Sequence, residues 1–98
     1  MSYTAVVTGA TRGLGRGIAR GFGSKGANVV VTGRSKDDLA AVSKEINNLG
    51  GKALPIVCDH ADDAAVEATF VQIKSELGGI DILVNNALPS YQFNPSAA

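Results

Sequence analysis

Apolar residues fall into two patterns that alternate along the chain. Short runs rich in β-branched residues occur at 3–7, 29–32, 53–58 and 80–84. Segments with apolar residues three or four positions apart occur at 13–24, 36–49 and 62–77. The short runs predict buried strands, and the spaced segments predict amphipathic helices. The expected order of elements is therefore β-α-β-α-β-α-β.

Right-handed crossovers between these strands lead to one topology. It is an α/β fold, a Rossmann-type doubly wound parallel sheet with strand order 3-2-1-4. The first two helices are expected on one face and the third on the other, with a crevice between strands 1 and 4. Pro55 cannot donate a hydrogen bond to a ladder, so strand 3 should lie at an edge.

This sheet is only part of the full architecture, because strand 4 would be an unpaired edge and a single helix would cover one face. We therefore expect residues 1–98 to be the N-terminal part of one longer dinucleotide-binding domain, with an irregular tail at 88–98.

The first helix should begin near Gly13. The side chains predicted for its buried face are Leu14, Ile18, Ala19 and Phe22. The arginines left for solvent or ligand are Arg12, Arg16 and Arg20. Ser35 is the expected cap of the second helix, with Asp38 in the return position.

A glycine-rich segment joins the first strand to the first helix. Its glycines are Gly9, Gly13 and Gly15, in the spacing G-x-x-x-G-x-G. A strand, a glycine turn and a helix start form a phosphate cradle, because the first N–H groups of the helix are free and the helix dipole favours negative charge. Glycine lets the backbone approach a pyrophosphate closely. The glycines alone also fit an ordinary flexible loop.

Residues 8–15 match the pattern T-G-x-x-x-G-x-G at every fixed position, and in this motif the chain resembles the short-chain dehydrogenase/reductase family. The resemblance covers nearly all of 3–87. It implies a cofactor-binding loop made of Gly9, Thr11, Arg12, Gly13, Leu14 and Gly15.

Two arginines bear on the choice of cofactor. The loop after strand 2 lies beside the adenosine ribose in dinucleotide folds, where an acid suits NAD and an arginine suits the 2′-phosphate of NADP. This chain has Arg34 there and no acid at Gly33. Members of the family that use NADP often have a basic residue at the position of Arg12. Together the two arginines favour NADP over NAD, although either alone could be a solvated surface residue.

Asp59 and Asn86 follow strands 3 and 4. Ligands of parallel sheets bind beyond these carboxyl ends. The resemblance implies that Asp59 contacts the adenine amino group; a plain turn residue is the alternative. His60 is next in the chain, and a single histidine without a partner motif is more often structural than catalytic. Asn86 belongs to an Asn-Asn-Ala segment that matches most of the family's N-N-A-G element near the cofactor ribose, although Leu88 replaces its glycine.

The family's chemistry uses a serine and a Tyr-x-x-x-Lys pair in its second half. Neither tyrosine here has lysine four positions on, since Val7 follows Tyr3 and Pro95 follows Tyr91 at that distance. We therefore assign no catalytic residue and expect these 98 residues alone to be inactive. The resemblance implies that the whole protein is a homo-oligomeric, NADP-dependent oxidoreductase acting on a small carbonyl or alcohol substrate. The alternative is a non-catalytic dinucleotide-binding or interaction fragment.

Composition limits the other classes of function. Nine basic and nine acidic residues give a net charge of zero, with no basic run for nucleic acid, so phosphate binding must be local. One cysteine allows neither a disulfide framework nor a metal-ligand set. No run approaches the roughly 18 apolar residues of a membrane span. The first strand begins almost at once, which leaves no room for a signal peptide, and we expect a cytoplasmic protein.

Overall fold

Strands and helices alternate in the order that the apolar pattern predicts. The computed structural model describes residues 3–86, so the tail expected at 88–98 lies outside the described residues. The strands are β1 (Thr4–Thr8), β2 (Asn28–Gly33), β3 (Lys52–Val57) and β4 (Ile82–Asn85). The helices are α1 (Gly13–Ser24), α2 (Lys36–Asn48) and α3 (Asp63–Leu77).

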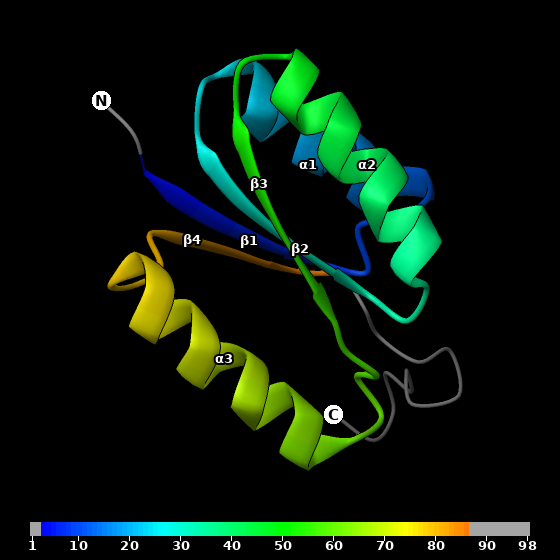
Figure 1. Ribbon diagram of the computed structural model, residues 1–98, viewed down its shortest axis with the longest axis vertical. Helices are drawn as coiled ribbons and strands as arrows, with labels where there is room; N and C mark the ends of the chain where they lie inside the picture. Colours follow the sequence, from blue (N-terminus) through cyan, green and yellow to red (C-terminus); the bar gives the residue numbers. More distant parts are fainter. Residues whose placement is uncertain (1–2, 87–98) are drawn as a thin grey trace, which may run out of the picture.

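The four strands form one parallel sheet in the order β3-β2-β1-β4, which confirms the predicted topology (Figure 1). Val6 of β1 pairs with Val30 on one side and with Leu83 of β4 on the other. Pro55 lies opposite Val31 in the edge strand β3, where one side of the strand needs no donor.

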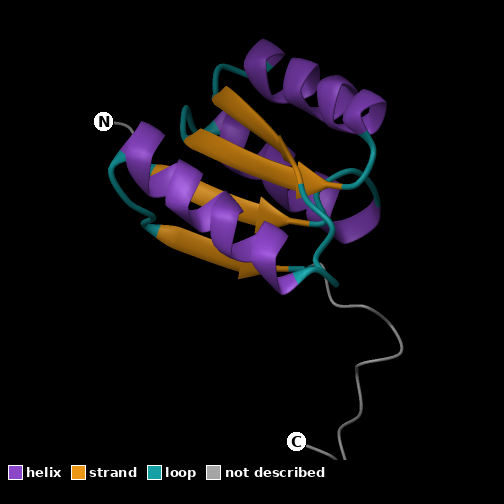
Figure 2. Cartoon of the chain, turned by 60° about the horizontal axis from the view of Figure 1, so that its bottom comes forward, coloured by secondary structure: helices purple, strands orange, loops and turns teal. Residues whose placement is uncertain are grey.

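Helices cover both faces of the sheet, with α1 and α2 on one side and α3 on the other (Figure 2). Alternate residues of the central strands therefore enter two separate cores. Val7, Val29 and Val31 pack with α1 and α2, whereas Val6 and Val30 face α3. This double burial explains why β1 and β2 read as continuous apolar runs instead of alternating ones.

Local capping signals set the ends of α2 and α3. Ser35 Oγ accepts a hydrogen bond from the Asp38 N–H at 3.2 Å, as expected for the start of α2. Asp62 Oδ1 does the same for α3, accepting from the N–H of Ala64 at 3.0 Å. Gly78 ends α3 with a φ of 80°, a left-handed conformation in which glycine pays no steric penalty.

The face that α1 buries differs from the prediction. Leu14 is 73% exposed, and the buried residues of α1 are Gly15, Ala19 and Gly23. This small-residue stripe lets α1 lie close to α2: a Cβ added at Gly23 would come within 3.0 Å of Ile46 Cγ2. The prediction is confirmed for Ala19, which is fully buried, and for Ile18 and Phe22, which pack partly buried against the core, but it is wrong for Leu14. The buried Gly15 and Gly23 were not expected, because glycine does not register as an apolar position.

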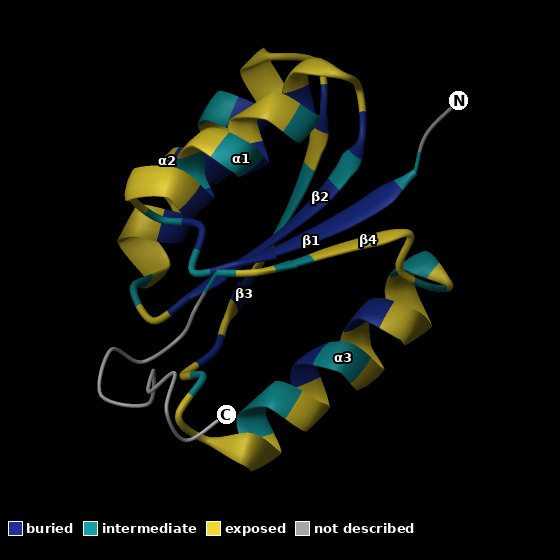
Figure 3. Cartoon of the chain, turned by 180° about the vertical axis from the view of Figure 1, so that it is seen from behind, coloured by how far each residue is buried: buried dark blue, intermediate teal, exposed yellow. Residues whose placement is uncertain are grey.

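The β4 edge is more exposed than the central strands β1 and β2 (Figure 3). Ile82 is 37% exposed and Leu83 is 50% exposed, whereas Val6 and Val30 have no exposed surface. Within the described residues β4 pairs only with β1, which agrees with the expected open edge. No helix in this part of the chain is long and apolar enough to cross a membrane.

Candidate functional site

The segments that follow the four strands meet along one edge of the sheet, because all four strands run parallel. Two backbone hydrogen bonds tie the first three of these segments together, and Asn86 ties in the fourth. The Ala10 N–H donates to the Thr32 carbonyl at 3.1 Å, and the Cys58 N–H donates to the Gly33 carbonyl at 2.8 Å. The fold therefore brings together the loops that contain every predicted site residue.

The glycine loop takes a conformation that needs its glycines. Gly9 and Gly13 have φ values of 63° and 58°, which side-chain-bearing residues rarely adopt. Gly15 is required for a different reason, since a Cβ there would lie 2.3 Å from the Gly9 carbonyl oxygen and 2.5 Å from Asn86 Nδ2. The first turn of α1 thus lies directly against the loop.

The N-terminus of α1 lacks the side-chain cap and the first-turn acid that α2 and α3 have. Arg12 occupies its N-cap position and makes no side-chain capping hydrogen bond, and the first turn contains no acid. The first N–H groups of a helix must find other acceptors, and the dipole favours an anion among them. Of the three helices in residues 3–86, α1 alone therefore begins with no side-chain cap.

Asn86 reaches the glycine loop from β4. Its Nδ2 donates to the Gly9 carbonyl at 3.1 Å, and its backbone N–H donates to Thr8 Oγ1 at 2.9 Å. The Thr8 hydroxyl in turn donates to Asn85 Oδ1 at 3.1 Å. Asn86 and Thr8 thus fix the glycine loop to the end of β4. Sequence reasoning placed Asn86 at this site but did not identify the part played by Thr8.

Arg12 and Arg34 are both exposed, and neither has an ion-pair partner within the described residues. Arg12 follows Thr11 and Arg34 follows Gly33 in the sequence. Thr11 and Gly33 lie in close contact, since a Cβ added at Gly33 would be 2.9 Å from Thr11 Cγ2. Two unpaired guanidinium groups therefore come from neighbouring loops at this edge of the sheet. Such groups match the geometry of a phosphate.

Arg16 is excluded from this set because it is paired. Its Nε donates to Glu45 Oε1 at 2.9 Å, and its Nη2 contacts Glu45 Oε2. The hydrogen bond from Arg16 lowers the pKa of Glu45, and the same bond raises the pKa of Arg16. Arg20 lies near the same carboxylate, with 3.8 Å between Nε and Oε1. This cluster joins α1 to α2.

Asp59 is exposed two residues after the end of β3. Its Oδ1 accepts from the Ala61 N–H at 3.0 Å, so this carboxylate does shape a turn. The neighbouring His60 is half-buried, and its Nε2 forms a 2.7 Å hydrogen bond with Thr32 Oγ1. Burial lowers the pKa of His60, and the Asp59 charge partly opposes this shift.

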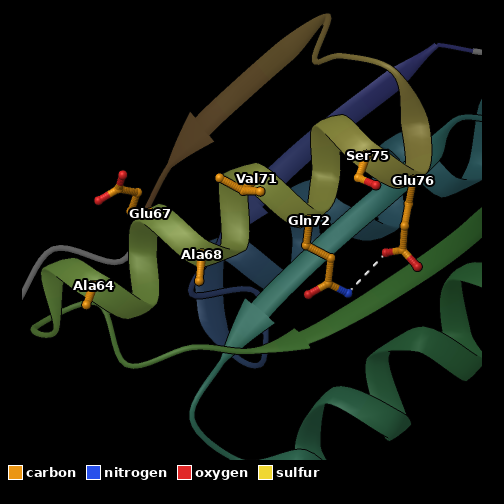
Figure 4. A pocket seen from close by; sticks show the side chains of 7 residues that line it. All are labelled: Ala64, Glu67, Ala68, Val71, Gln72, Ser75 and Glu76. Atoms are coloured by element: carbon orange, nitrogen blue, oxygen red, sulfur yellow. Dashed lines mark hydrogen bonds between the residues drawn. The ribbon is translucent and has the colours of Figure 1, made fainter.

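Two other features of the described residues can be compared with this edge of the sheet. No group of three or more His, Cys, Asp or Glu side chains in residues 3–86 could hold a metal ion. A shallow hollow lies on α3 between Ala64 and Glu76, with a hydrogen bond from Gln72 Nε2 to Glu76 Oε2 beside it (Figure 4). All of its lining residues belong to α3, so it does not include the loops at the carboxyl ends of the strands.

Comparison with known proteins identifies a family and several relatives. A family model described as short chain dehydrogenase matches residues 3–93. The protein named dehydrogenase/reductase SDR family member 1 from Mus musculus is 46% identical over 88 residues, which cover 89% of this chain and 28% of that protein. The chain thus spans less than a third of the length of this curated relative.

Solved structures of short-chain oxidoreductases are also similar to this chain. A metagenomic short-chain oxidoreductase in complex with NADP is 40% identical, with a TM-score of 0.83 over 97% of this chain and 46% of that one. L-sorbose reductase from Gluconobacter frateurii, solved with NADPH and L-sorbose, is 31% identical, with a TM-score of 0.83 over 98% of this chain and 39% of that one.

Proposed function

Because this chain belongs to the short-chain dehydrogenase family, we propose that it binds NADP(H) and provides the cofactor-binding part of an oxidoreductase. The observation that supports this most directly is the start of α1. There an uncapped helix N-terminus lies against a glycine loop with no room for a side chain at Gly15. A pyrophosphate suits such a place, because the backbone N–H groups and the helix dipole both favour an anion.

The residues divide according to the parts of the cofactor. Backbone from Gly9 to Gly15 would hold the pyrophosphate. The guanidinium groups of Arg12 and Arg34, which have no ion-pair partner within residues 3–86, would hold the 2′-phosphate that distinguishes NADP from NAD. The NADP and NADPH present in two related structures support this choice.

Asp59 and Asn86 would contact the remaining parts. The Asp59 carboxylate would accept a hydrogen bond from the adenine amino group. Asn86 would line the ribose side of the crevice, where its amide already supports the Gly9 carbonyl.

When bound, the nicotinamide supplies the hydride chemistry, and the protein supplies binding and orientation. For the whole protein we propose hydride exchange with a small carbonyl or alcohol compound. The printed sequence contains no Tyr-x-x-x-Lys element, so none of its residues is assigned to the proton transfer. A cytoplasmic location and assembly into a homo-oligomer stay predictions.

Fluorescence titration of the protein at its full natural length with NADPH and with NADH tests the proposal. We expect both to bind, with the lower dissociation constant for NADPH. Binding of neither cofactor would refute the proposed function. Equal affinity would refute the choice of NADP but not dinucleotide binding. Turnover with simple aldehydes, ketones or alcohols would separate an oxidoreductase from a non-catalytic binding fragment.

A further inference from the structure

His60 is joined to β2 by a contact that the proposed cofactor chemistry does not use. The 2.7 Å hydrogen bond between His60 Nε2 and Thr32 Oγ1 spans 28 positions of sequence. Thr32 has no exposed surface, and His60 is half-buried. A hydroxyl enclosed in this way needs a hydrogen-bond partner, and the imidazole provides it.

Thr32 itself is held firmly by two neighbouring segments. Its carbonyl accepts from the Ala10 N–H of the glycine loop at 3.1 Å. The carbonyl of the next residue, Gly33, accepts from the Cys58 N–H at 2.8 Å. The backbone of Thr32 and Gly33, at the carboxyl end of a central strand, is therefore hydrogen-bonded to a neighbouring segment on each side.

The turn that contains Asp59 has fewer attachments. Asp59 Oδ1 accepts from the Ala61 N–H at 3.0 Å, and its carbonyl accepts from the Asp62 N–H at 2.9 Å. Both hydrogen bonds lie within the turn, and the backbone link to the sheet is the bond from the Cys58 N–H, one residue before Asp59, to the Gly33 carbonyl. In the described part of the chain, the bond between His60 and Thr32 is the side-chain link from this turn to a strand.

We infer that His60 is a positioning residue that acts through Thr32 to hold Asp59 toward the adenine amino group of NADP(H). This inference rests on the proposed function. Asp59 Oδ2 has no partner within residues 3–86, so it can accept a hydrogen bond from a ligand. That bond requires the two heavy atoms to be about 3 Å apart, and a loosened turn would not maintain this distance.

The neutral imidazole suits this role. It can pair with the Thr32 hydroxyl as donor or acceptor, since one ring nitrogen has a proton and the other has a lone pair. Burial lowers the pKa of His60, whereas Asp59, the charged group that faces it, raises that pKa. Because burial has the larger effect, the uncharged ring is favoured near neutral pH.

The test compares NADPH with its hypoxanthine analogue, in which the purine has an oxygen in place of the amino group. The protein at its full natural length should prefer NADPH by about tenfold, because the analogue lacks the hydrogen bond to the carboxylate. His60→Leu should reduce the preference to about twofold, since a mobile carboxylate gains less from the amino group. His60→Gln, whose amide can still pair with Thr32, should keep most of it.

Two further variants separate positioning from a general loss of stability. Thr32→Val preserves shape and removes the hydroxyl, so it should match His60→Leu, and the double variant should lose no more than either single one. Asp59→Asn should abolish the preference directly, after which His60→Leu should change it no further.

An unchanged preference in either His60→Leu or Thr32→Val would overturn the positioning role, even if the free energy of unfolding fell. Independent, multiplying effects in the double variant would also overturn it, because the two residues would then not act as a pair. If the unsubstituted protein bound neither cofactor, the proposed function would fail, and this inference with it.

Discussion

Replacing Gly15 by alanine is a direct test of the packing between α1 and the glycine loop. The new Cβ would lie 2.3 Å from the Gly9 carbonyl oxygen and 2.5 Å from Asn86 Nδ2. Real Cβ atoms essentially never come closer than 3.0 Å to a neighbour, so the loop backbone or the first turn of α1 must move. Overpacking of this kind costs about 1–3 kcal/mol, against which alanine gains about 1 kcal/mol of helix propensity.

The larger effect should be on cofactor binding. The carbonyl that must move belongs to the loop whose N–H groups would face the pyrophosphate. Losing one such hydrogen bond to a charged group costs about 1.5–3 kcal/mol, which corresponds to roughly a tenfold to hundredfold higher dissociation constant for NADPH. Isothermal titration measures this constant, and urea unfolding measures the cost in stability.

Gly17→Ala is the matched control. Gly17 is exposed in the same helix, and a Cβ there would meet nothing within 4 Å. It should therefore stabilise the fold by about 0.5–1 kcal/mol and leave the affinity for NADPH unchanged. The reasoning is refuted if Gly15→Ala binds NADPH as tightly as the unsubstituted protein, or if Gly17→Ala weakens binding equally.

Three further outcomes are expected. Arg34→Asp should weaken NADPH binding about tenfold or more but NADH binding little, because only NADPH has a 2′-phosphate to repel; equal losses would exclude the phosphate contact. Ser43→Ala should raise the free energy of unfolding by about 1 kcal/mol, since the Ser43 hydroxyl is buried without a partner in the described part of the chain; a lower value in urea unfolding would show that the hydroxyl is satisfied. His60 should contribute a pH dependence to stability, because burial lowers its pKa from the ordinary 6.5 and its neutral form favours the folded state. This contribution is complete above pH 6.5 and is lost as the pH falls through the folded-state pKa, so His60→Gln should flatten the curve of unfolding free energy against pH below 6.5; parallel curves for both proteins would contradict it.

Those parts of the fold that depend on neighbours in sequence were predictable. β-branched runs marked β1 and β2, and caps such as Ser35 marked a helix start within a residue. The strand order followed from the handedness of the crossovers. Apolar spacing identified Ile18, Ala19 and Phe22 on α1 but not Gly15 and Gly23, because these glycines pack by lacking a side chain.

The same holds for the site: features set by the chain's local sequence could be predicted, and contacts between distant segments could not. Arg12 and Asp59 could be placed at the carboxyl ends of strands, because a parallel sheet puts those ends on one edge. The bond between Thr32 and His60 could not be foreseen, since it joins residues 28 positions apart and depends on the register of β2 and on the path of the turn after β3. The pairing of Arg16 could not be predicted for the same reason, because its partner Glu45 lies on another helix.

Helix capping separates the proposed anion site from the other helix starts in residues 3–86. Ser35 and Asp62 occupy the first N–H groups of α2 and α3, and acids in the first turns of those helices would repel a phosphate. At α1 the cap residue is Arg12, no acid follows in the first turn, and its guanidinium has no ion-pair partner in the described part of the chain. A chain with zero net charge attracts anions only where its local fields are unbalanced. The unprotected N-terminus of α1, with Arg12 and Arg34 beside it, is such a place, and its neighbours Asp59 and Asn86 lie at the same sheet edge.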